Sequence, residues 1–196
     1  MDVTDDELIG KYLDGDMVAF ETLYHRYDGR LLGFLLAMRA DRDLAEDLAQ
    51  KTWLKVIGRF ANYEARGTFR AWLFTVARRL WIDEARSAWS RKRVALESSR
   101  NGESGGAGKQ FDVEDPSSGP AEHALARERR EMVTDAIRSM PPELSQTVLL
   151  RIDGDLTYRE IAEEMGCPLG TALWRAKEAE RRIRKFLGIE VTEKTR

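Results

Sequence analysis

Cysteine, histidine and long apolar runs are scarce in this chain of 196 residues, and each scarcity excludes a class of protein. The one cysteine, Cys167, rules out a disulfide within the chain and is typical of a protein in a reducing compartment. No apolar run approaches the roughly 20 residues that span a bilayer, and the acidic start "MDVTDDELIG" has no apolar signal core. We therefore expect a cytoplasmic protein with no stable membrane insertion.

The same shortage argues against an enzyme. His25 and His123 are the two histidines, and neither has metal-ligand spacing with Cys167 or with the other. The sequence also has no phosphate-binding loop of the G-x-x-x-x-G-K-[ST] type. We expect no catalytic residue, no metal and no cofactor, and no motif supports the enzyme alternative.

The charges of the chain nearly balance, with 32 basic and 34 acidic residues and a net charge of −2. This balance argues against a general nucleic-acid binder. The charged fraction of 34% and the shortage of strand-type alternation instead favour exposed amphipathic helices. Any contact with nucleic acid must therefore come from locally basic segments.

Apolar residues recur every three to four positions through most of the chain, which predicts helices. The first half should hold four of them. One spans residues 5–13, one is capped by Asp16, one is capped by Asp41, and one runs from Thr68 to about Lys92.

Residues 94–119 are rich in Gly, Ser and acidic residues and have few aliphatic ones, which is typical of a disordered linker. The alternative is a loop inside one domain, but so long a loop is uncommon in a compact domain. The helical pattern resumes at Ala121. The sequence thus predicts an all-α protein of two small helical domains joined by a flexible linker. The expected segments are a first domain at 1–93, an acidic linker at 94–120, a second domain at 121–190 and a tail at 191–196.

The stretch from Thr157 to Leu187 has the pattern of a helix-turn-helix. Thr157 and Glu160 form a T-x-x-E capping box that begins a short helix, and Gly166 is a permissive residue at its end. The second helix should bury an apolar stripe made of Leu169, Leu173, Ala176, Ala179, Ile183 and Leu187. Its opposite face should carry Thr171, Trp174, Arg175, Glu178, Arg182 and Lys185.

This second helix is locally basic, with six basic and two acidic side chains in residues 170–187. A recognition helix needs such an arrangement, because side chains near its start reach base edges and later Lys and Arg side chains contact phosphates. The alternative is a solvated helix with Glu–Arg pairs. The capping box, the tight turn and the apolar stripe together favour DNA binding.

A second basic segment, residues 75–93, also has six basic and two acidic side chains, with aromatic residues interleaved. Cations beside rings suit single-stranded DNA, because bases stack on the rings while the backbone follows the positive charge. Trp72 falls on the apolar stripe and should pack in the core, whereas Trp81 and Trp89 are candidate contacts. Just upstream, residues 41–60 begin acidic and become basic and aromatic, and the acidic start is also ordinary helix-dipole chemistry.

Four segments of the chain, in the order in which they occur, resemble a bacterial sigma factor of the extracytoplasmic-function (ECF) class. "GDMVAFETLYHRYDGRLLGFL" resembles the opening helices of region two, and "DLAEDLAQKTWLKVI" resembles its polymerase-binding segment. "GTFRAWLFTVARRLWIDEARSAWSRKR" resembles the segment that melts and reads the minus-ten element. "MPPELSQTVLLRIDGDLTYREIAEEMGCPLGTALWRAKEAERRIRKFL" resembles region four, which reads the minus-thirty-five element.

The resemblance implies a protein that binds core RNA polymerase and directs promoter-specific initiation. The implied partners are core RNA polymerase, promoter DNA as duplex and as melted non-template strand, and an anti-sigma factor. The implied polymerase contacts are Asp43, Glu46, Asp47, Gln50, Trp53 and Leu54. The implied minus-ten contacts are Tyr63, Arg66, Arg78, Arg79, Trp81 and Arg86, with loop 61–68 cradling a flipped base. The implied minus-thirty-five contacts are Arg159, Thr171, Trp174, Arg175, Glu178 and Arg182.

Three features depart from the family pattern. Arg79 stands where the family often has Asn, so the resemblance does not identify the flipped base. Leu173 and Trp174 replace residues that are often polar, which favours upstream readout by shape and apolar contact. The linker is long for this class, and its acidic residues 112–115 suggest the hypothesis that it folds back on a basic helix and restrains DNA binding.

The main alternative is a stand-alone helix-turn-helix regulator that binds duplex DNA without polymerase. It explains residues 157–187. It gives no role to the basic segment 75–93 or to the long linker.

Overall fold

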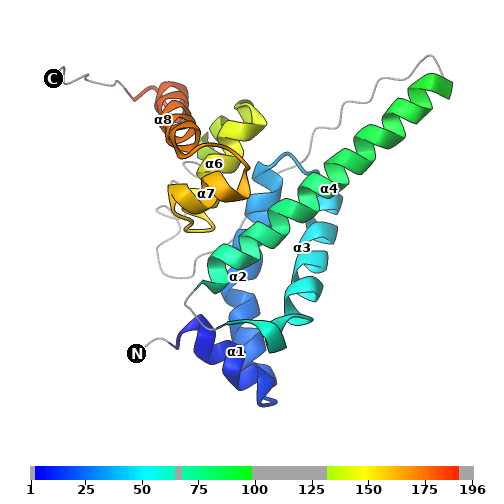
Figure 1. Cartoon of the computed structure of the whole chain (residues 1–196), viewed down its shortest axis with the longest axis vertical. Coiled ribbons are helices and arrows are strands. Elements are labelled where there is room, and N and C mark those ends of the chain that lie inside the picture. The colour runs from blue at the N-terminus through cyan, green and yellow to red at the C-terminus, as the bar shows by residue number, and fades with distance from the viewer. Residues whose placement is uncertain (1–2, 65–67, 99–131, 190–196) are drawn as a thin grey trace, which may run out of the picture. The chain divides into compact units, whose positions relative to one another are not determined.

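The computed structural model describes residues 3–64, 68–98 and 132–189, with side chains described up to Trp89 in the second range. Every regular element in these residues is helical, and they belong to two compact units (Figure 1). This confirms the predicted all-α fold with two helical parts. Arg66, the predicted linker beyond residue 98, the predicted domain start at Ala121 and the tail at 191–196 lie outside the described residues.

The first unit contains helices whose starts the sequence encodes through caps. Its elements are α1 (Asp5–Leu13), α2 (Met17–Ala37, in this unit up to Leu36), α3 (Arg42–Ile57), the short 3-10 helix η1 (Phe60–Asn62) and α4 (Phe69–Ser98). The Asp16 carboxylate accepts a hydrogen bond from the Val18 amide at 2.9 Å, and the Asp41 carboxylate accepts one from the Leu44 amide at 2.9 Å. Both predicted caps are confirmed, because these bonds satisfy amides that the first turn leaves free.

Helix α4 is longer than the sequence pattern predicts. It continues to Ser98, beyond Lys92, so the predicted start of the linker at residue 94 lies inside a helix. The extension "VALES" contains good helix formers, and the first glycine after it is Gly102. The point where the apolar pattern stops therefore did not predict where the helix ends.

An aromatic core joins α2, α3 and α4. Trp53 of α3 packs against Phe20 and Tyr24 of α2, with ring centroids 5.9 and 5.2 Å away. Phe34 of α2 meets Phe74 of α4 edge-on at 5.1 Å. Such edge-to-face pairs add to the stabilisation from burial. These ring contacts connect α2 with α3 and with the first turns of α4.

The second unit is a compact helical group around the predicted helix-turn-helix. Residues 132–139 are helical and are followed by α6 (Pro142–Ile152), α7 (Tyr158–Glu164) and α8 (Leu169–Phe186). The three named helices pack on one another around buried side chains such as Leu150 and Ile161. None of the helices in the described ranges combines the length and the apolar composition that a membrane span needs.

The predicted capping box at the start of α7 is confirmed. The Glu160 amide donates to the Thr157 hydroxyl at 3.3 Å, and the Thr157 amide donates to the Glu160 carboxylate at 2.7 Å. Gly166 follows with φ of 62°, a left-handed conformation that glycine adopts at little cost. This short turn fixes where α8 begins relative to α7.

Candidate nucleic-acid and partner interfaces

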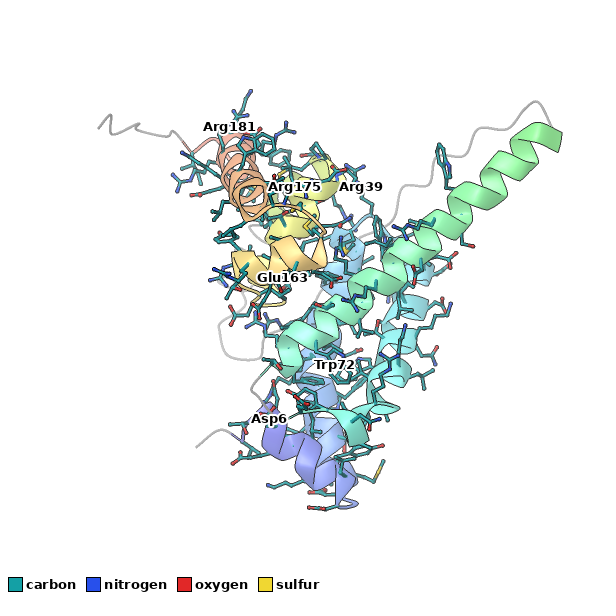
Figure 2. All side chains as sticks on the ribbon, viewed as in Figure 1. Asp6, Arg39, Trp72, Glu163, Arg175 and Arg181 are labelled. Atoms are coloured by element: carbon teal, nitrogen blue, oxygen red, sulfur yellow. The ribbon has the colours of Figure 1, made fainter. Side chains whose placement is uncertain are left out.

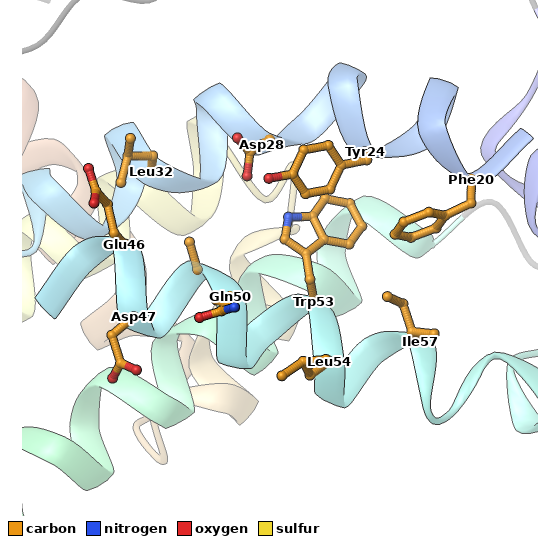
Figure 3. A pocket seen from close by; sticks show the side chains of 11 residues that line it. Phe20, Tyr24, Asp28, Leu32, Glu46, Asp47, Gln50, Trp53, Leu54 and Ile57 are labelled. Carbon is orange, nitrogen blue, oxygen red and sulfur yellow. The ribbon is translucent and has the colours of Figure 1, made fainter. Parts of the chain in front are cut away.

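A groove of about 730 Å³ lies between α2 and α3 (Figure 3). It is lined by Phe20, Tyr24, Asp28, Leu32, Glu46, Asp47, Ala49, Gln50, Trp53, Leu54 and Ile57. The carboxylates of Glu46 and Asp47 lie toward one end, and Phe20 and Ile57 lie toward the other. An apolar groove with a few polar groups at its edge is the usual form of a binding site.

This groove collects most of the residues for which the sequence predicted polymerase contacts. Glu46, Asp47, Gln50, Trp53 and Leu54 line it. Asp43 is exposed in the first turn of α3 and does not line it. The groove residues from α2 were absent from the prediction, although Tyr24 and Asp28 at i and i+4 place two polar groups on one helix face.

Trp53 forms part of the groove wall from inside the core. Its side chain is 4% exposed, and its indole nitrogen has no hydrogen-bond acceptor within the described part of the chain. Tyr24, the ring beside it, is hydrogen-bonded to Asp28, and burial together with this bond raises the pKa of Tyr24. A buried N–H without an acceptor costs about 1–3 kcal/mol. Leu54, by contrast, is 66% exposed and offers an apolar contact.

The charged residues at the edge of the groove are paired along α3. Arg42 lies 2.6 Å from the Glu46 carboxylate, and Lys51 lies 2.5 Å from that of Asp47. Each pair spans one helical turn and is solvent-exposed, so each contributes little to stability. A bound partner can compete for either carboxylate at small cost.

A second candidate surface lies at the start of α4 and along its exposed side. Tyr63 is half-buried and donates from its hydroxyl to the Asp6 carboxylate at 2.9 Å. Its ring stacks on Trp72 with centroids 5.3 Å apart and an interplanar angle of 20°. Burial and the bond to Asp6 raise the pKa of Tyr63 to about 12. The stack leaves Trp72 half-buried rather than fully in the core.

The predicted minus-ten residues on α4 differ in how far their side chains are exposed to solvent. Arg79 and Arg86 are exposed and Trp81 is half-buried. Trp89, a further candidate contact, is 72% exposed. Arg78 is 7% exposed, because it lies one turn after the fully buried Phe74 on the packed face of the helix. The structure therefore favours a packing role for Arg78 and leaves Arg79, Arg86 and Trp89 as the accessible groups.

A third candidate surface is the exposed side of α8, and here the predicted buried stripe is partly wrong. Leu169 and Leu173 are 41% and 45% exposed, whereas Ala172 and Ala179 are fully buried. Because the alanine side chains are small, α8 packs closely on α6 and α7 through them. In this orientation Leu169 and Leu173 are exposed to solvent. The pattern of large apolar residues did not reveal an interface made of small ones.

Because α8 buries a different face from the one predicted, only some of the predicted minus-thirty-five residues are accessible. Trp174 is 62% exposed, and Arg182 and Arg159 of α7 are exposed, while Thr171, Arg175 and Glu178 are half-buried. Four further basic residues of α8 are exposed although they were not among the predicted contacts: Lys177, Arg181, Arg184 and Lys185. From the sequence, Lys185 had been placed on the polar face and the other three had not been placed. A helical count from the buried alanines Ala172 and Ala179 would have identified them.

Two half-buried residues of α8, Arg175 and Glu178, are held by neighbours. Figure 2 labels Arg175 and Arg181 on this helix. Arg175 donates to the Cys167 sulfur at 3.6 Å. The Glu178 carboxylate accepts from Arg181 at 2.7 and 2.8 Å and from Arg182 at 2.8 Å. Hydrogen bonds from Arg181 and then Arg182 lower the pKa of Glu178 to about 2. Glu178 thus serves to orient two cations on this surface.

No group of His, Cys, Asp and Glu side chains within residues 3–64, 68–98 and 132–189 has an arrangement that could hold a metal ion. The chemistry of these surfaces is that of hydrogen bonds, ring faces and cations. It suits the recognition of macromolecules.

Comparison with known proteins identifies both units. Residues 23–91 match the family model of Sigma-70 region 2, and residues 130–177 match that of Sigma-70, region 4. The chain is 30% identical over 184 residues to the ECF RNA polymerase sigma-E factors of Salmonella typhimurium and Escherichia coli, covering 90% of this chain and 92% of each relative. The corresponding protein of Haemophilus influenzae is 27% identical over 186 residues, covering 90% of this chain and 93% of the relative.

Solved structures show the same fold. The sigma factor RpoE of Bartonella quintana, in complex with the anti-sigma factor NepR, matches with a TM-score of 0.61 at 20% identity, covering 88% of this chain and 98% of that one. CnrH, in complex with the cytosolic domain of CnrY, matches with a TM-score of 0.58 at 16% identity, covering 95% and 99%. Because both sigma regions occur in order and relatives align over nearly their whole length, this chain belongs to the ECF RNA polymerase sigma factors, which direct promoter-specific transcription initiation.

Proposed function

We propose that the first unit docks on core RNA polymerase through the groove between α2 and α3. The observation that carries the proposal is the groove itself, which joins exposed Leu54, the ring of Trp53 and the carboxylates of Glu46 and Asp47. Binding to duplex DNA alone does not require an apolar groove with acidic edges. A protein partner that buries Leu54 and offers cations to these carboxylates would gain from both contacts.

The second part of the proposal concerns the minus-ten element. Extruding a base from the stack costs a few kcal/mol, so a formed pocket beside the melted strand helps to offset that cost. The loop 61–68, whose residues 65–67 lie outside the described ranges, would receive the flipped base beside the Tyr63–Trp72 stack. Exposed Arg79, Arg86 and Trp89 on α4 would follow the rest of the non-template strand through cations and a ring face.

The third part concerns the minus-thirty-five element. The exposed side of α8 would enter the major groove, with Trp174 near its start against base edges and with Lys177 and Arg181 on phosphates. Arg159 of α7 would contact the adjacent backbone. The protein would act in the cytoplasm as an initiation factor and carry out no chemistry of its own.

Reconstituted transcription tests this proposal. The protein is mixed with core RNA polymerase and sheared DNA from its own genome, and transcript starts are sequenced against a core-only control. Starts that share two upstream motifs support the proposal. Absence of new starts, together with tight binding of the free protein to duplex sites, would instead establish a stand-alone regulator.

A protein inhibitor is the remaining part of the proposal. The matched structures of RpoE and CnrH are complexes, the first with an anti-sigma factor and the second with the cytosolic domain of CnrY. An inhibitor that covered the α2–α3 groove would block polymerase binding. Affinity capture from native cells should recover such a protein, and capture that always yields polymerase and never an inhibitor would contradict this part.

A further inference from the structure

Glu178 lies between two arginines on the exposed side of α8. Glu178, Arg181 and Arg182 stand at positions i, i+3 and i+4, so their side chains share one face of the helix. The Oε1 atom of Glu178 accepts from Arg181 Nη2 at 2.7 Å and from Arg182 Nε at 2.8 Å. Its Oε2 atom accepts from Arg181 Nε at 2.8 Å. One carboxylate therefore holds two guanidinium groups.

The two arginines retain donors that these bonds do not use. Arg181 binds Glu178 through the edge formed by Nε and Nη2, so N–H groups remain on the edge between its two Nη atoms. Arg182 gives only its Nε–H to Glu178 and retains both Nη atoms. An edge with two N–H groups matches the oxygens of a phosphate, because arginine can bind phosphate through two parallel hydrogen bonds.

The side chains of this cluster differ in exposure. That of Glu178 is 17% exposed, whereas those of Arg181 and Arg182 are 59% and 43% exposed. A molecule that approaches this side of α8 therefore contacts the guanidinium groups more readily than the carboxylate. Ion pairs of such exposed side chains add little to stability, so support of the helix is a weak explanation for the cluster. Its main consequence is that two long side chains have fixed directions before any partner binds.

Fixed directions affect binding to a nucleic-acid backbone. Phosphate contacts set the register and the orientation of a protein on a duplex, although they carry no sequence information themselves. An arginine that rotates freely must be ordered on binding, which costs about two- to tenfold in affinity per side chain. Glu178 orders both side chains in advance.

We propose that Glu178 is a positioning residue for promoter recognition, because it holds Arg181 and Arg182 as a preformed clamp for the phosphates beside the minus-thirty-five element. The inference rests on the proposed role of α8 at that element. A negative charge on a DNA-binding helix repels phosphates, so by charge alone Glu178 would weaken binding. The clamp predicts the opposite sign wherever the register of the helix on DNA is fixed.

The effect of the clamp depends on DNA sequence even though a phosphate does not. On the cognate element, contacts to base edges hold α8 in one register, so each guanidinium group faces the same phosphate and its direction counts. On other DNA the helix has no fixed register, and binding depends on charge rather than on direction. Glu178 therefore strengthens cognate binding and weakens non-specific binding, which raises the ratio of the two affinities.

The test measures binding of the holoenzyme to two duplexes by fluorescence anisotropy. One carries the upstream element of a promoter recovered from the transcription experiment, and the other carries the same element scrambled. Glu178→Gln keeps nearly the same size but removes the charge and one acceptor oxygen. It should bind the cognate duplex about three- to tenfold more weakly, the ordering cost of one or two arginines, and bind the scrambled duplex slightly more tightly.

Glu180→Gln is the matched control. Glu180 is on the same helix, and within the described ranges its carboxylate binds one arginine, Arg184, at 2.5 Å. The variant makes the same change of charge without releasing Arg181 or Arg182. It should bind both duplexes as tightly as wild type or slightly more tightly, so only Glu178→Gln is expected to weaken cognate binding.

A lysine background separates positioning from charge. Lysine keeps the positive charge but has no planar fork, so Arg181→Lys combined with Arg182→Lys removes the groups that Glu178 orients. In that background Glu178→Gln should no longer weaken cognate binding and should behave as Glu180→Gln does.

The outcomes separate this inference from the proposed function. Tighter cognate binding by Glu178→Gln would indicate charge repulsion, and equal losses on both duplexes would indicate general damage to α8. An undiminished loss in the lysine background would show an effect that does not pass through the arginines. Each of these three results would overturn the inference. If wild-type holoenzyme does not distinguish the two duplexes, it is the proposed role of α8 that fails. If wild type distinguishes them and Glu178→Gln does so equally well, only the role of Glu178 fails.

Discussion

The ring of Tyr63 stacks almost parallel on that of Trp72, with centroids 5.3 Å apart and planes 20° from parallel. The ring centroid of Trp72 also lies 6.4 Å from that of Phe60 and 6.2 Å from that of Phe69. This half-buried ring therefore connects η1, Tyr63 and the start of α4. The stack is therefore both part of the core and the wall of the surface that we assign to the melted strand.

Removal of the Trp72 ring should destabilise the first unit. We expect Trp72→Ala to lower the free energy of unfolding by about 2–3 kcal/mol, below the range for fully buried rings because this one is half-buried. Trp72→Phe retains a stacking face and should lose less than half as much. Urea denaturation of the full chain, followed by circular dichroism, measures both. Trp89→Ala removes a ring that is 72% exposed and should stay within about 0.5 kcal/mol of wild type. Equal losses at Trp72 and Trp89 would contradict this account.

The exposed side chain of Leu54 makes a separate prediction for polymerase binding. It is 66% exposed on the wall of the groove, so a docked partner can bury it. We expect Leu54→Ala to lower the affinity for core polymerase about three- to tenfold, the worth of about one to two buried methylene groups, and to change the free energy of unfolding by about 0.5 kcal/mol or less. Competition binding to core polymerase and urea denaturation measure the two quantities.

The control for Leu54 is Leu13→Ala, which shortens a side chain that is 51% exposed outside the groove. It should leave polymerase affinity unchanged. Unaltered affinity in Leu54→Ala would show that the partner does not bury this side chain.

Local sequence chemistry was a reliable guide to where helices begin. The carboxylates of Asp16 and Asp41 and the hydroxyl of Thr157 cap helices as their positions predict, because capping is decided within three residues. Where helices end, and which way they turn, depends on packing. Helix α4 continues past its apolar stripe, and α8 buries Ala172 and exposes Leu173 because its neighbours require a close approach.

The candidate sites were predictable only where one helix supplies them. The groove residues of α3 were predicted from the family resemblance alone, because the acidic start of this helix is also ordinary helix-dipole chemistry. The bond from Tyr63 to Asp6 spans 57 positions in the sequence, and no periodicity encodes it. The burial of Arg78 was equally hidden, because a charged residue next to a buried face has the same sequence pattern as one exposed to DNA.

The carboxylate of Glu178 should stay ionised far into the acid range. Its pKa is lowered to about 2 by hydrogen bonds from Arg181 and Arg182, against 4.5 for an unperturbed glutamate. A lowered pKa means that this cluster favours the folded state above about pH 4.5 and that its contribution is lost as the pH falls toward 2. Carbon-detected NMR titration of the side-chain carboxyl measures the value directly. Arg181→Ala combined with Arg182→Ala should return it toward 4.5. An unchanged value in that double variant would remove the two arginines as the cause.

Trp174 and Lys177 should contribute differently to promoter recognition, although both are exposed on α8. A ring against base edges, such as a thymine methyl group, discriminates between sequences, so Trp174→Ala should weaken binding to the cognate upstream element by about 1–3 kcal/mol and leave binding to a scrambled element nearly unchanged. A cation on a phosphate does not discriminate, so Lys177→Ala should weaken both about equally and reduce the slope of log affinity against log salt by about 1. Fluorescence anisotropy of the holoenzyme on both duplexes across a salt series measures these effects. Lys11→Ala, an exposed cation on α1, is the control for net charge. Equal loss on both duplexes in Trp174→Ala would make this ring a general contact and move sequence readout to other residues of α8.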